Sequence, residues 1–267
     1  DGSLVYAQGA EELLNPASNV KLFTAAAALA RLGPDYRFET EFLTESDYKE
    51  GKAKTLYVRG HGDPTVTTER LYGIVSELIH SGLKDVGELV VDDSWFDNER
   101  EAPGYDQEVG DKAYLAPTGA LSLNWNTLGV YLRPAEKVGL PGTTELEPPS
   151  DYFTLDSRLF TGTRTQRRFT VGTELEKDRI HQKVTVSGWV PVEKGTWSVW
   201  KKIEQPALYF GFTLKSLLVQ RGVKVKGRLR AGLVPPAGVR TLHLSMSETL
   251  DLVLKRLNKH SSNFVAE

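Results

Sequence analysis

An apolar stretch near the N-terminus constrains the fold of this chain more than any other feature. Residues 20–32 are rich in alanine and leucine, Pro16 stands where the first turn of a helix accepts it, and Gly33-Pro34 is a stop signal. The pattern predicts a helix from about residue 16 to residue 32 with almost no polar face. A helix that is apolar on nearly all sides belongs in the middle of a domain. We therefore expect neighbouring elements to cover it.

Alternating and helical patterns follow along the first half of the chain. Period-two alternation predicts half-buried strands at residues 37–43, 54–58 and 88–92, and a short strand at 2–8. Residues 68–83 instead repeat with helical spacing, and the predicted apolar face is Leu71, Ile74, Val75 and Leu78. Strands and helices mixed in this order are typical of an α+β protein.

The second half begins with a β-rich segment. Between residues 134 and 202, Pro and Gly turns separate alternating stretches, which is typical of a small all-β insertion. A helix is predicted at 206–222, and an alternating strand at 223–230. The last helix is expected to begin at the capping box Ser245-Met-Ser-Glu248 and to end in a polar turn at 259–263.

Charge and composition exclude several kinds of chemistry. With 33 Lys and Arg against 35 Asp and Glu, the net charge is −2, and the chain lacks the basic surface that nucleic acid binding requires. No cysteine is present and the five histidines are scattered, so we expect no disulfide, no metal and no cofactor. No apolar run reaches the ~18 residues of a membrane span. Asp92 and Asp93, at a strand end, are interpreted as solvated carboxylates.

The remaining candidate for chemistry is the pattern Ser-x-x-Lys, in which lysine takes the proton of the serine hydroxyl. It occurs at Ser18/Lys21, Ser46/Lys49, Ser81/Lys84 and Ser198/Lys201. Only Ser18 stands at the start of an apolar helix, where positions i and i+3 share a face and burial disfavours the charged form of Lys21. The other pairs lie in a polar turn, at a helix end and on a strand. We therefore predict that Ser18 is a nucleophile and Lys21 its base.

A second pattern, Ser-x-Asn, could pass a proton to a leaving amine and hold a substrate amide. It occurs twice, at Ser122-Leu-Asn124 and at Ser261-Ser-Asn263. Spacing does not choose between the two. The first lies in an apolar stretch and has the pattern of a buried structural turn, whereas the second lies in a polar turn directly after an amphipathic helix.

Together these segments resemble the class C penicillin-binding proteins, the serine D-alanyl-D-alanine carboxypeptidases and endopeptidases of peptidoglycan. Residues 15–29 are similar to the family's nucleophile helix, and 257–267 to its second catalytic motif. The segments that resemble its inserted domains are 62–65, 92–97, 116–124, 148–152 and 206–209. A long insertion separates the two motifs in this family. Here Ser18 and Ser261 are 243 residues apart, which selects Ser261 and Asn263 as the second motif.

The resemblance implies an α+β fold, in which an incomplete β-lactamase/transpeptidase-like catalytic domain carries two nested inserted domains. The catalytic domain is assigned residues 1–35 and 241–267, the outer insertion 36–150 and 202–240, and the inner, mostly β insertion 151–201. The family's third motif, Lys-Thr-Gly, does not occur in the sequence. We therefore expect a chain that is truncated at its C-terminus.

The same resemblance implies a role for each site residue. Ser18 attacks the D-Ala-D-Ala carbonyl, Lys21 takes its proton, Ser261 relays a proton to the departing D-Ala, and Asn263 orients the substrate and Lys21. Water or an amine then resolves the acyl-enzyme. β-Lactam antibiotics are expected to acylate the same Ser18.

The implied partners are peptidoglycan peptides and β-lactams, and the implied location is the periplasm. The family often places an acid at the amino end of diaminopimelate; residues 103–109 offer Asp106 and Glu108 for this contact, and the choice between Asp106, Glu108 or neither stays open. Two other functions stay open. The missing Lys-Thr-Gly favours a non-catalytic peptidoglycan-binding or scaffolding relative with the same fold, and a β-lactamase with the same serine and lysine ranks below it.

Overall fold

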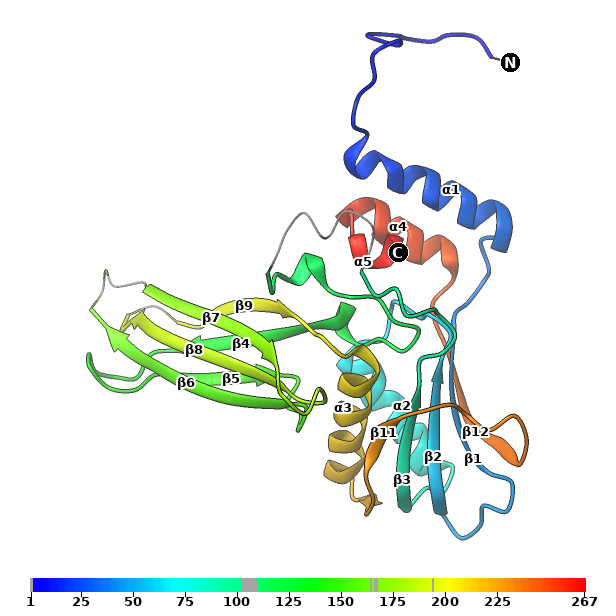
Figure 1. Ribbon diagram of the computed structural model, residues 1–267, viewed down its shortest axis with the longest axis vertical. Helices are drawn as coiled ribbons and strands as arrows, with labels where there is room; N and C mark the ends of the chain where they lie inside the picture. Colours follow the sequence, from blue (N-terminus) through cyan, green and yellow to red (C-terminus); the bar gives the residue numbers. More distant parts are fainter. Residues whose placement is uncertain (1, 102–109, 164, 166–167, 194) are drawn as a thin grey trace.

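A mixed sheet forms the lower part of the protein in the computed structural model, which describes residues 2–101, 110–163, 165, 168–193 and 195–267 (Figure 1). The strand order is β10-β3-β2-β1-β12, and β11 also pairs with β3. These strands are β1 (Glu39–Glu45), β2 (Lys52–Gly60), β3 (Asp85–Asp92), β10 (Lys224–Val225), β11 (Leu229–Ala231) and β12 (Val239–Met246). β1 runs antiparallel to β2 and β12, whereas β3 runs parallel to β2, β10 and β11. The chain therefore enters and leaves this sheet through neighbouring strands.

Two helices contact each other and pack against this sheet, α2 (Thr68–His80) and α3 (Pro206–Gln220). The predicted apolar face of α2 is confirmed, since its buried residues are Leu71, Ile74, Val75 and Leu78. Thr67 caps this helix by accepting a hydrogen bond from the backbone N–H of Arg70. α3 begins with Pro206 in its first turn and is buried over most of its length.

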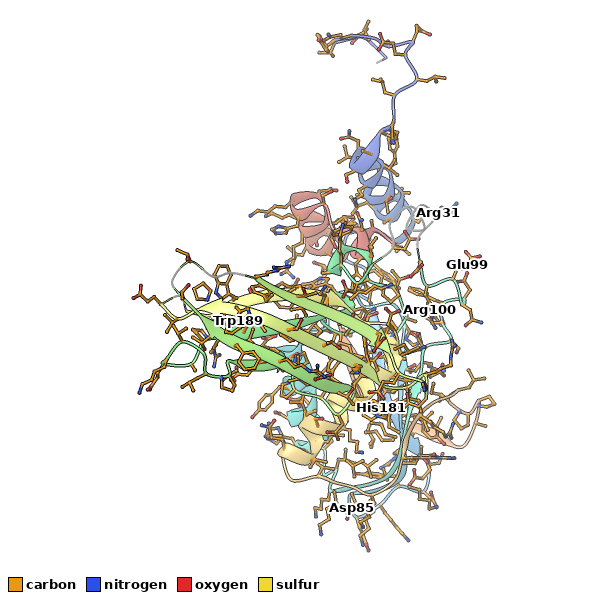
Figure 2. All side chains as sticks on the ribbon, turned by 60° about the vertical axis from the view of Figure 1, so that its left-hand side comes forward. Arg31, Asp85, Glu99, Arg100, His181 and Trp189 are labelled. Atoms are coloured by element: carbon orange, nitrogen blue, oxygen red, sulfur yellow. The ribbon has the colours of Figure 1, made fainter. Side chains whose placement is uncertain are left out.

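A second body, to the left of α3 in Figure 1, consists of two three-stranded sheets with the orders β5-β4-β9 and β6-β8-β7. Its strands are β4 (Thr127–Arg133), β5 (Thr143–Glu147), β6 (Phe153–Gly162), β7 (Arg168–Leu175), β8 (Gln182–Pro191) and β9 (Trp197–Lys202). Figure 2 labels His181, which directly precedes β8, and Trp189, which lies near the other end of that strand. The predicted β-rich character of residues 134–202 is confirmed. β4 lies before that segment and pairs with β9, so the domain boundary at 150/151 stays a prediction.

Two separate apolar cores hold the molecule together. The larger one runs through the mixed sheet, α2, α3 and the β-sheet pair. The smaller one joins α1 (Val20–Leu32) to α4 (Leu250–His260) through Ala25, Leu250, Leu254 and Leu257. Figure 1 shows these two helices side by side above the mixed sheet, blue and red, with the N-terminal segment leading away from them.

The expected burial of α1 on all sides is wrong for the residues that the structure describes. Ala25 is its buried residue, while Leu22 is 58% and Phe23 75% exposed. The physical reason is that α4 and the short α5 (Asn263–Ala266) pack on one face of α1 only. None of the described helices is long and apolar enough to cross a membrane.

Three local predictions are also corrected. Residues 2–7 form no strand, because a strand needs a partner for its backbone hydrogen bonds and no described strand lies against them. The strand predicted at 223–230 is interrupted between β10 and β11, where Gly227 passes so close to the carbonyl oxygen of Gly87 that a side chain would collide with it. Ser245 does not start the last helix; it pairs with Thr40 within β12, and α4 begins at Leu250.

Candidate active site

Ser18 lies in a short 3-10 turn, Ala17–Asn19, that leads directly into α1. The backbone N–H of Ala17 donates to Asn15 Oδ1 at 2.9 Å, which fixes the entry to this turn. Lys21 follows in the first turn of α1, and its Nζ donates a 3.1 Å hydrogen bond to Ser18 Oγ. The helical spacing therefore places the amine at the hydroxyl, as the pattern predicts.

The same amine reaches the other end of the chain. Lys21 Nζ donates a 2.7 Å hydrogen bond to Asn263 Oδ1, and this contact is partly buried. Asn263 is the first residue of α5, and the N-cap before it is Ser262, whose hydroxyl accepts from the backbone N–H of Val265 at 3.3 Å. Lys21 thus holds together a hydroxyl and an amide that are distant in sequence.

Ser261 connects α4 to this turn with a left-handed backbone, φ 53° and ψ 41°. Its side chain is exposed, and among the described residues it forms no hydrogen bond to Ser18, Lys21 or Asn263. The structure therefore brings three of the four predicted site residues into direct contact and leaves Ser261 at the rim of the cluster. Asp106 and Glu108, the predicted acidic contacts, lie outside the described residues.

The alternative Ser-x-Asn pair, Ser122 and Asn124, has a structural role. Ser122 is 4% exposed, and its hydroxyl donates to the carbonyl oxygen of Gly119. The side chain of Asn124 accepts from the backbone N–H of Thr68 at 2.9 Å and donates to the Thr68 hydroxyl at 2.8 Å. These hydrogen bonds attach the loop that contains Asn124 to the first turn of α2. The interpretation of this motif as a structural turn is confirmed.

Next to this pair lies an unusual turn that the sequence analysis missed. Asn124, Trp125 and Asn126 have φ values of 50°, 55° and 51°, so three successive non-glycine residues are left-handed. Each such residue costs on the order of 1–3 kcal/mol and persists only where its surroundings enforce the conformation. Asn126 is fully buried and donates to Pro117 O and Ser122 Oγ at 2.8 and 2.9 Å. The flanking amides hold the turn, and Trp125 projects from it with 47% of its surface exposed.

Asp92 is buried and Asp93 is half-buried, which corrects their interpretation from the sequence as solvated carboxylates. Asp92 accepts from the backbone N–H of Val234 at 2.7 Å, and Asp93 accepts from that of Leu121 at 2.6 Å. Burial raises the pKa of Asp93, and the ion pair with Arg100 at 2.6 Å partly opposes this. Figure 2 shows Arg100 on the loop that follows β3. Loops fold over the end of β3, and their N–H groups need these acceptors.

Comparison of the whole sequence with known protein families identifies the family of this chain. The sequence model of the D-Ala-D-Ala carboxypeptidase 3 (S13) family matches residues 1–267, and the chain belongs to this family. The predicted relation to the class C penicillin-binding proteins is thereby confirmed.

Two curated relatives extend over nearly all of the chain. A D-alanyl-D-alanine carboxypeptidase of Actinomadura sp. (strain R39) is 33% identical over 276 residues, which cover 100% of this chain and 51% of that protein. The D-alanyl-D-alanine carboxypeptidase DacB of Haemophilus influenzae is 24% identical over 259 residues, covering 94% of this chain and 52% of its own length. The chain thus spans about half the length of the curated relatives it matches.

Solved structures share the fold. Penicillin binding protein 4 (dacB) of Haemophilus influenzae superposes with a TM-score of 0.77 at 22% identity, covering 94% of this chain and 55% of that one. Its complex with a novel β-lactam gives a TM-score of 0.69 at 20% identity, with coverages of 94% and 53%. The predicted α+β fold is confirmed.

Proposed function

We propose that this protein is a serine D-alanyl-D-alanine carboxypeptidase/endopeptidase that acts on peptidoglycan stem peptides through an acyl-enzyme on Ser18. One observation carries the proposal: Lys21 Nζ lies within hydrogen-bond distance of both Ser18 Oγ and Asn263 Oδ1. A nucleophile, a base and a group that orients the base are the components that acyl transfer requires. Membership of the S13 family supports the same reaction.

The proposed reaction assigns one step to each residue. Ser18 Oγ attacks the carbonyl carbon between the two D-Ala residues, and Lys21, as the general base, takes the hydroxyl proton. The tetrahedral intermediate collapses by breaking the C–N bond, and Ser261 relays the proton to the departing amine. Water then attacks the ester on Ser18 and releases the shortened peptide. Asn263 holds Lys21 and the substrate amide throughout.

The exposed position of Ser261 fits its proposed role. A residue that delivers a proton to a leaving amine must face the substrate, and Ser261 stands at the rim of the Ser18/Lys21/Asn263 cluster. We further propose that the protein acts in the periplasm, where its substrate lies, and that β-lactams acylate Ser18. The β-lactam complex of penicillin binding protein 4 from Haemophilus influenzae supports the last point.

Intact-mass analysis of the full-length protein tests this function. After exposure to a labelled β-lactam, wild-type protein is expected to gain one adduct, and peptide mapping is expected to place it on Ser18. Ser18→Ala is the central variant, and Ser46→Ala is the matched control because Ser46 belongs to another Ser-x-x-Lys pair. An adduct of equal yield in the Ser18→Ala protein would contradict the proposal.

A non-catalytic, peptidoglycan-binding relative is the second candidate, favoured by the lack of Lys-Thr-Gly in the sequence. It predicts muropeptide binding without turnover in both wild type and Ser18→Ala. A β-lactamase is the third candidate and predicts rapid release of the acyl group from Ser18. Slow release together with cleavage of D-Ala-D-Ala peptides would exclude both.

A further inference from the structure

Ala17, the residue directly before Ser18, has a left-handed backbone with φ 44°. Residues other than glycine seldom adopt such values, and asparagine and aspartate do so more often because their short polar side chains bond to the nearby backbone. The side chain of alanine has no polar atom, so the surroundings of Ala17 must enforce its conformation. The contacts around Ala17 therefore determine the position of Ser18.

Packing does not enforce this conformation in the part of the chain that the structure describes. Residues 2–20 are all exposed, and the turn Ala17–Asn19 contributes no residue to either apolar core. Figure 1 shows the segment before α1 leading away from the rest of the molecule. The local constraint on Ala17 is therefore hydrogen bonding.

Two hydrogen bonds constrain the backbone around Ser18. The side-chain oxygen Oδ1 of Asn15 accepts from the backbone N–H of Ala17 at 2.9 Å, and the carbonyl oxygen of Pro16 accepts from the N–H of Asn19 at 3.0 Å. The first bond spans Pro16, and the second spans Ala17 and Ser18. The ring of Pro16 also holds φ at −69°, so the backbone between Asn15 and Ala17 has little freedom.

The bond from Asn15 satisfies a donor that the helix leaves open, since the first N–H groups of a helical segment have no carbonyl partner within it. Neither Pro16, which precedes the 3-10 turn, nor Asn19, which precedes α1, forms a side-chain cap. Within the described chain, Asn15 is the side chain that bonds to the backbone at this end of α1. Asparagine bonds in this way to the N–H two residues further on in many turns.

The geometry of this turn decides whether the Ser18 hydroxyl reaches its base. Lys21 Nζ lies 3.1 Å from Ser18 Oγ and is also bonded to Asn263 Oδ1 at 2.7 Å. Because Lys21 belongs to α1 and is held by Asn263, a change in the turn before α1 moves the hydroxyl and leaves the amine in place. A displacement of about 1 Å between reacting groups can slow a reaction about 10²-fold.

We propose that Asn15 is a positioning residue, whose side-chain oxygen holds Ala17 in the left-handed conformation and thereby keeps Ser18 Oγ at Lys21 Nζ. The inference rests on the proposed function. Asn15 acts on the nucleophile through the backbone of Ala17. Without the side-chain oxygen, Ala17 returns to the right-handed or extended backbone that alanine favours, and Ser18 moves with it.

Acylation by a labelled β-lactam, followed on the full-length protein at several concentrations, separates the dissociation constant from the acylation rate constant. Asn15→Ala is expected to lower the rate constant about 10–100-fold and to leave the dissociation constant within about twofold of wild type, because only the hydroxyl is misplaced. Asn258→Ala is the matched control at an exposed position of α4, and it is expected to change neither constant. The melting temperature of Asn15→Ala is expected to equal that of wild type, since Asn15 is exposed.

Two further variants test the route through Ala17. Asn15→Asp keeps an oxygen that accepts from the same N–H, and it is expected to be acylated at a rate within about threefold of wild type. Ala17→Gly, introduced into Asn15→Ala, is expected to raise the acylation rate about threefold or more, because glycine adopts positive φ without the cost that alanine incurs. A role of Asn15 in stability alone would give no such recovery.

The outcomes separate this role of Asn15 from the proposed function. Equal acylation rates in Asn15→Ala and wild type overturn the positioning role and keep the enzyme. A slow Asn15→Ala protein that Ala17→Gly does not accelerate also overturns it, because Asn15 would then act by another route. If the wild type is not acylated, the proposed function fails, and hydrogen exchange at the Ala17 amide then decides. Faster exchange in Asn15→Ala supports the hold on Ala17, and unchanged exchange overturns it.

Discussion

Lys21 and Asn263 are 242 positions apart in the chain, and the lysine Nζ donates a 2.7 Å hydrogen bond to the asparagine Oδ1. The hydrogen bond joins the helix that follows Ser18 to the helical turn that follows α4. An intramolecular hydrogen bond of this kind contributes roughly 0.5–1.5 kcal/mol. The two side chains meet because β1 pairs with β12, which places α1 beside α4.

Replacing Lys21 with methionine is expected to slow acylation of Ser18 about 10²–10⁴-fold, because the hydroxyl loses its general base. The rate is measured with a labelled β-lactam on the full-length protein. Lys49→Met is the control, since Lys49 belongs to the Ser46 pair in a polar turn. Equal rates in Lys21→Met and wild type would exclude Lys21 as the base.

Asn263→Ala is expected to reduce the same acylation rate roughly 2–10-fold, which corresponds to the loss of one hydrogen bond to the Lys21 amine. Asn258→Ala changes the same residue type at an exposed position of α4 and is expected to have no effect. If both variants acylate at the wild-type rate, the bond between Lys21 and Asn263 has no role in positioning the amine.

Trp125→Gly is expected to keep or raise the free energy of unfolding, by up to about 2 kcal/mol. Glycine relieves the left-handed backbone at φ 55°, while the flexibility it adds to the unfolded chain offsets part of that gain. Urea unfolding measures the change. Trp200→Gly is the contrasting variant, because glycine inside a strand is destabilising. A loss of more than about 1 kcal/mol in Trp125→Gly would show that its backbone is unstrained.

Asn126→Ala is expected to cost about 1–3 kcal/mol of unfolding free energy, because it leaves the buried carbonyl oxygen of Pro117 without its donor. The turn that carries Trp125 loses one of its two anchors at the same time. Chemical denaturation compares this variant with Asn258→Ala, which is expected to stay within about 0.5 kcal/mol of wild type.

Asp178 is expected to make the free energy of unfolding fall as the pH is lowered. A hydrogen bond with the His181 ring, at 2.6 Å, and backbone N–H donors lower the pKa of Asp178 from 3.8 to about 2 in the folded protein. A carboxyl whose pKa is lower in the folded state stabilises the protein fully above its unfolded pKa. That contribution is lost as the pH falls through about 2.

The stability difference between wild type and Asp178→Asn is therefore expected to shrink between pH 4 and pH 2. Urea unfolding at a series of pH values measures this difference, and NMR titration of the carboxyl carbon reads the pKa directly. A difference that is constant over this range would mean that the contact with His181 does not stabilise the ionised carboxylate.

Periodic patterns predicted much of this fold and the contact between two of the four candidate site residues. Leu71, Ile74, Val75 and Leu78 form the buried face of α2 as their spacing requires, because a helix on a sheet must bury one apolar stripe. Ser18 and Lys21 meet because positions i and i+3 share a face. Asn263 could be chosen over Asn124 only through resemblance to a family, since both stand in the same short motif.

What the sequence did not predict depends on partners that are distant along the chain. Ser245 has the pattern of a helix cap, yet its pairing with Thr40 draws it into β12. The position of Asp93 at a strand end is typical of a solvated acid. In the structure a loop packs against it, and the backbone N–H of Leu121 donates a hydrogen bond to its carboxylate. The left-handed turn at Trp125 is signalled only by the asparagines on either side, which tolerate this conformation better than other residues.

The pairing of β1 with β12 sets how much change the region between them tolerates. Glu39 lies opposite Met246 and Glu45 opposite Val239, and neighbouring strands are only ~4.8 Å apart. The chain between them therefore departs from β1 and returns at β12 through two adjacent points of the structure. A segment whose two ends are adjacent can change in length or be exchanged without displacing the elements outside it, here α1 and α4. A short linker between these two points would serve the same purpose for an engineer who wishes to remove it.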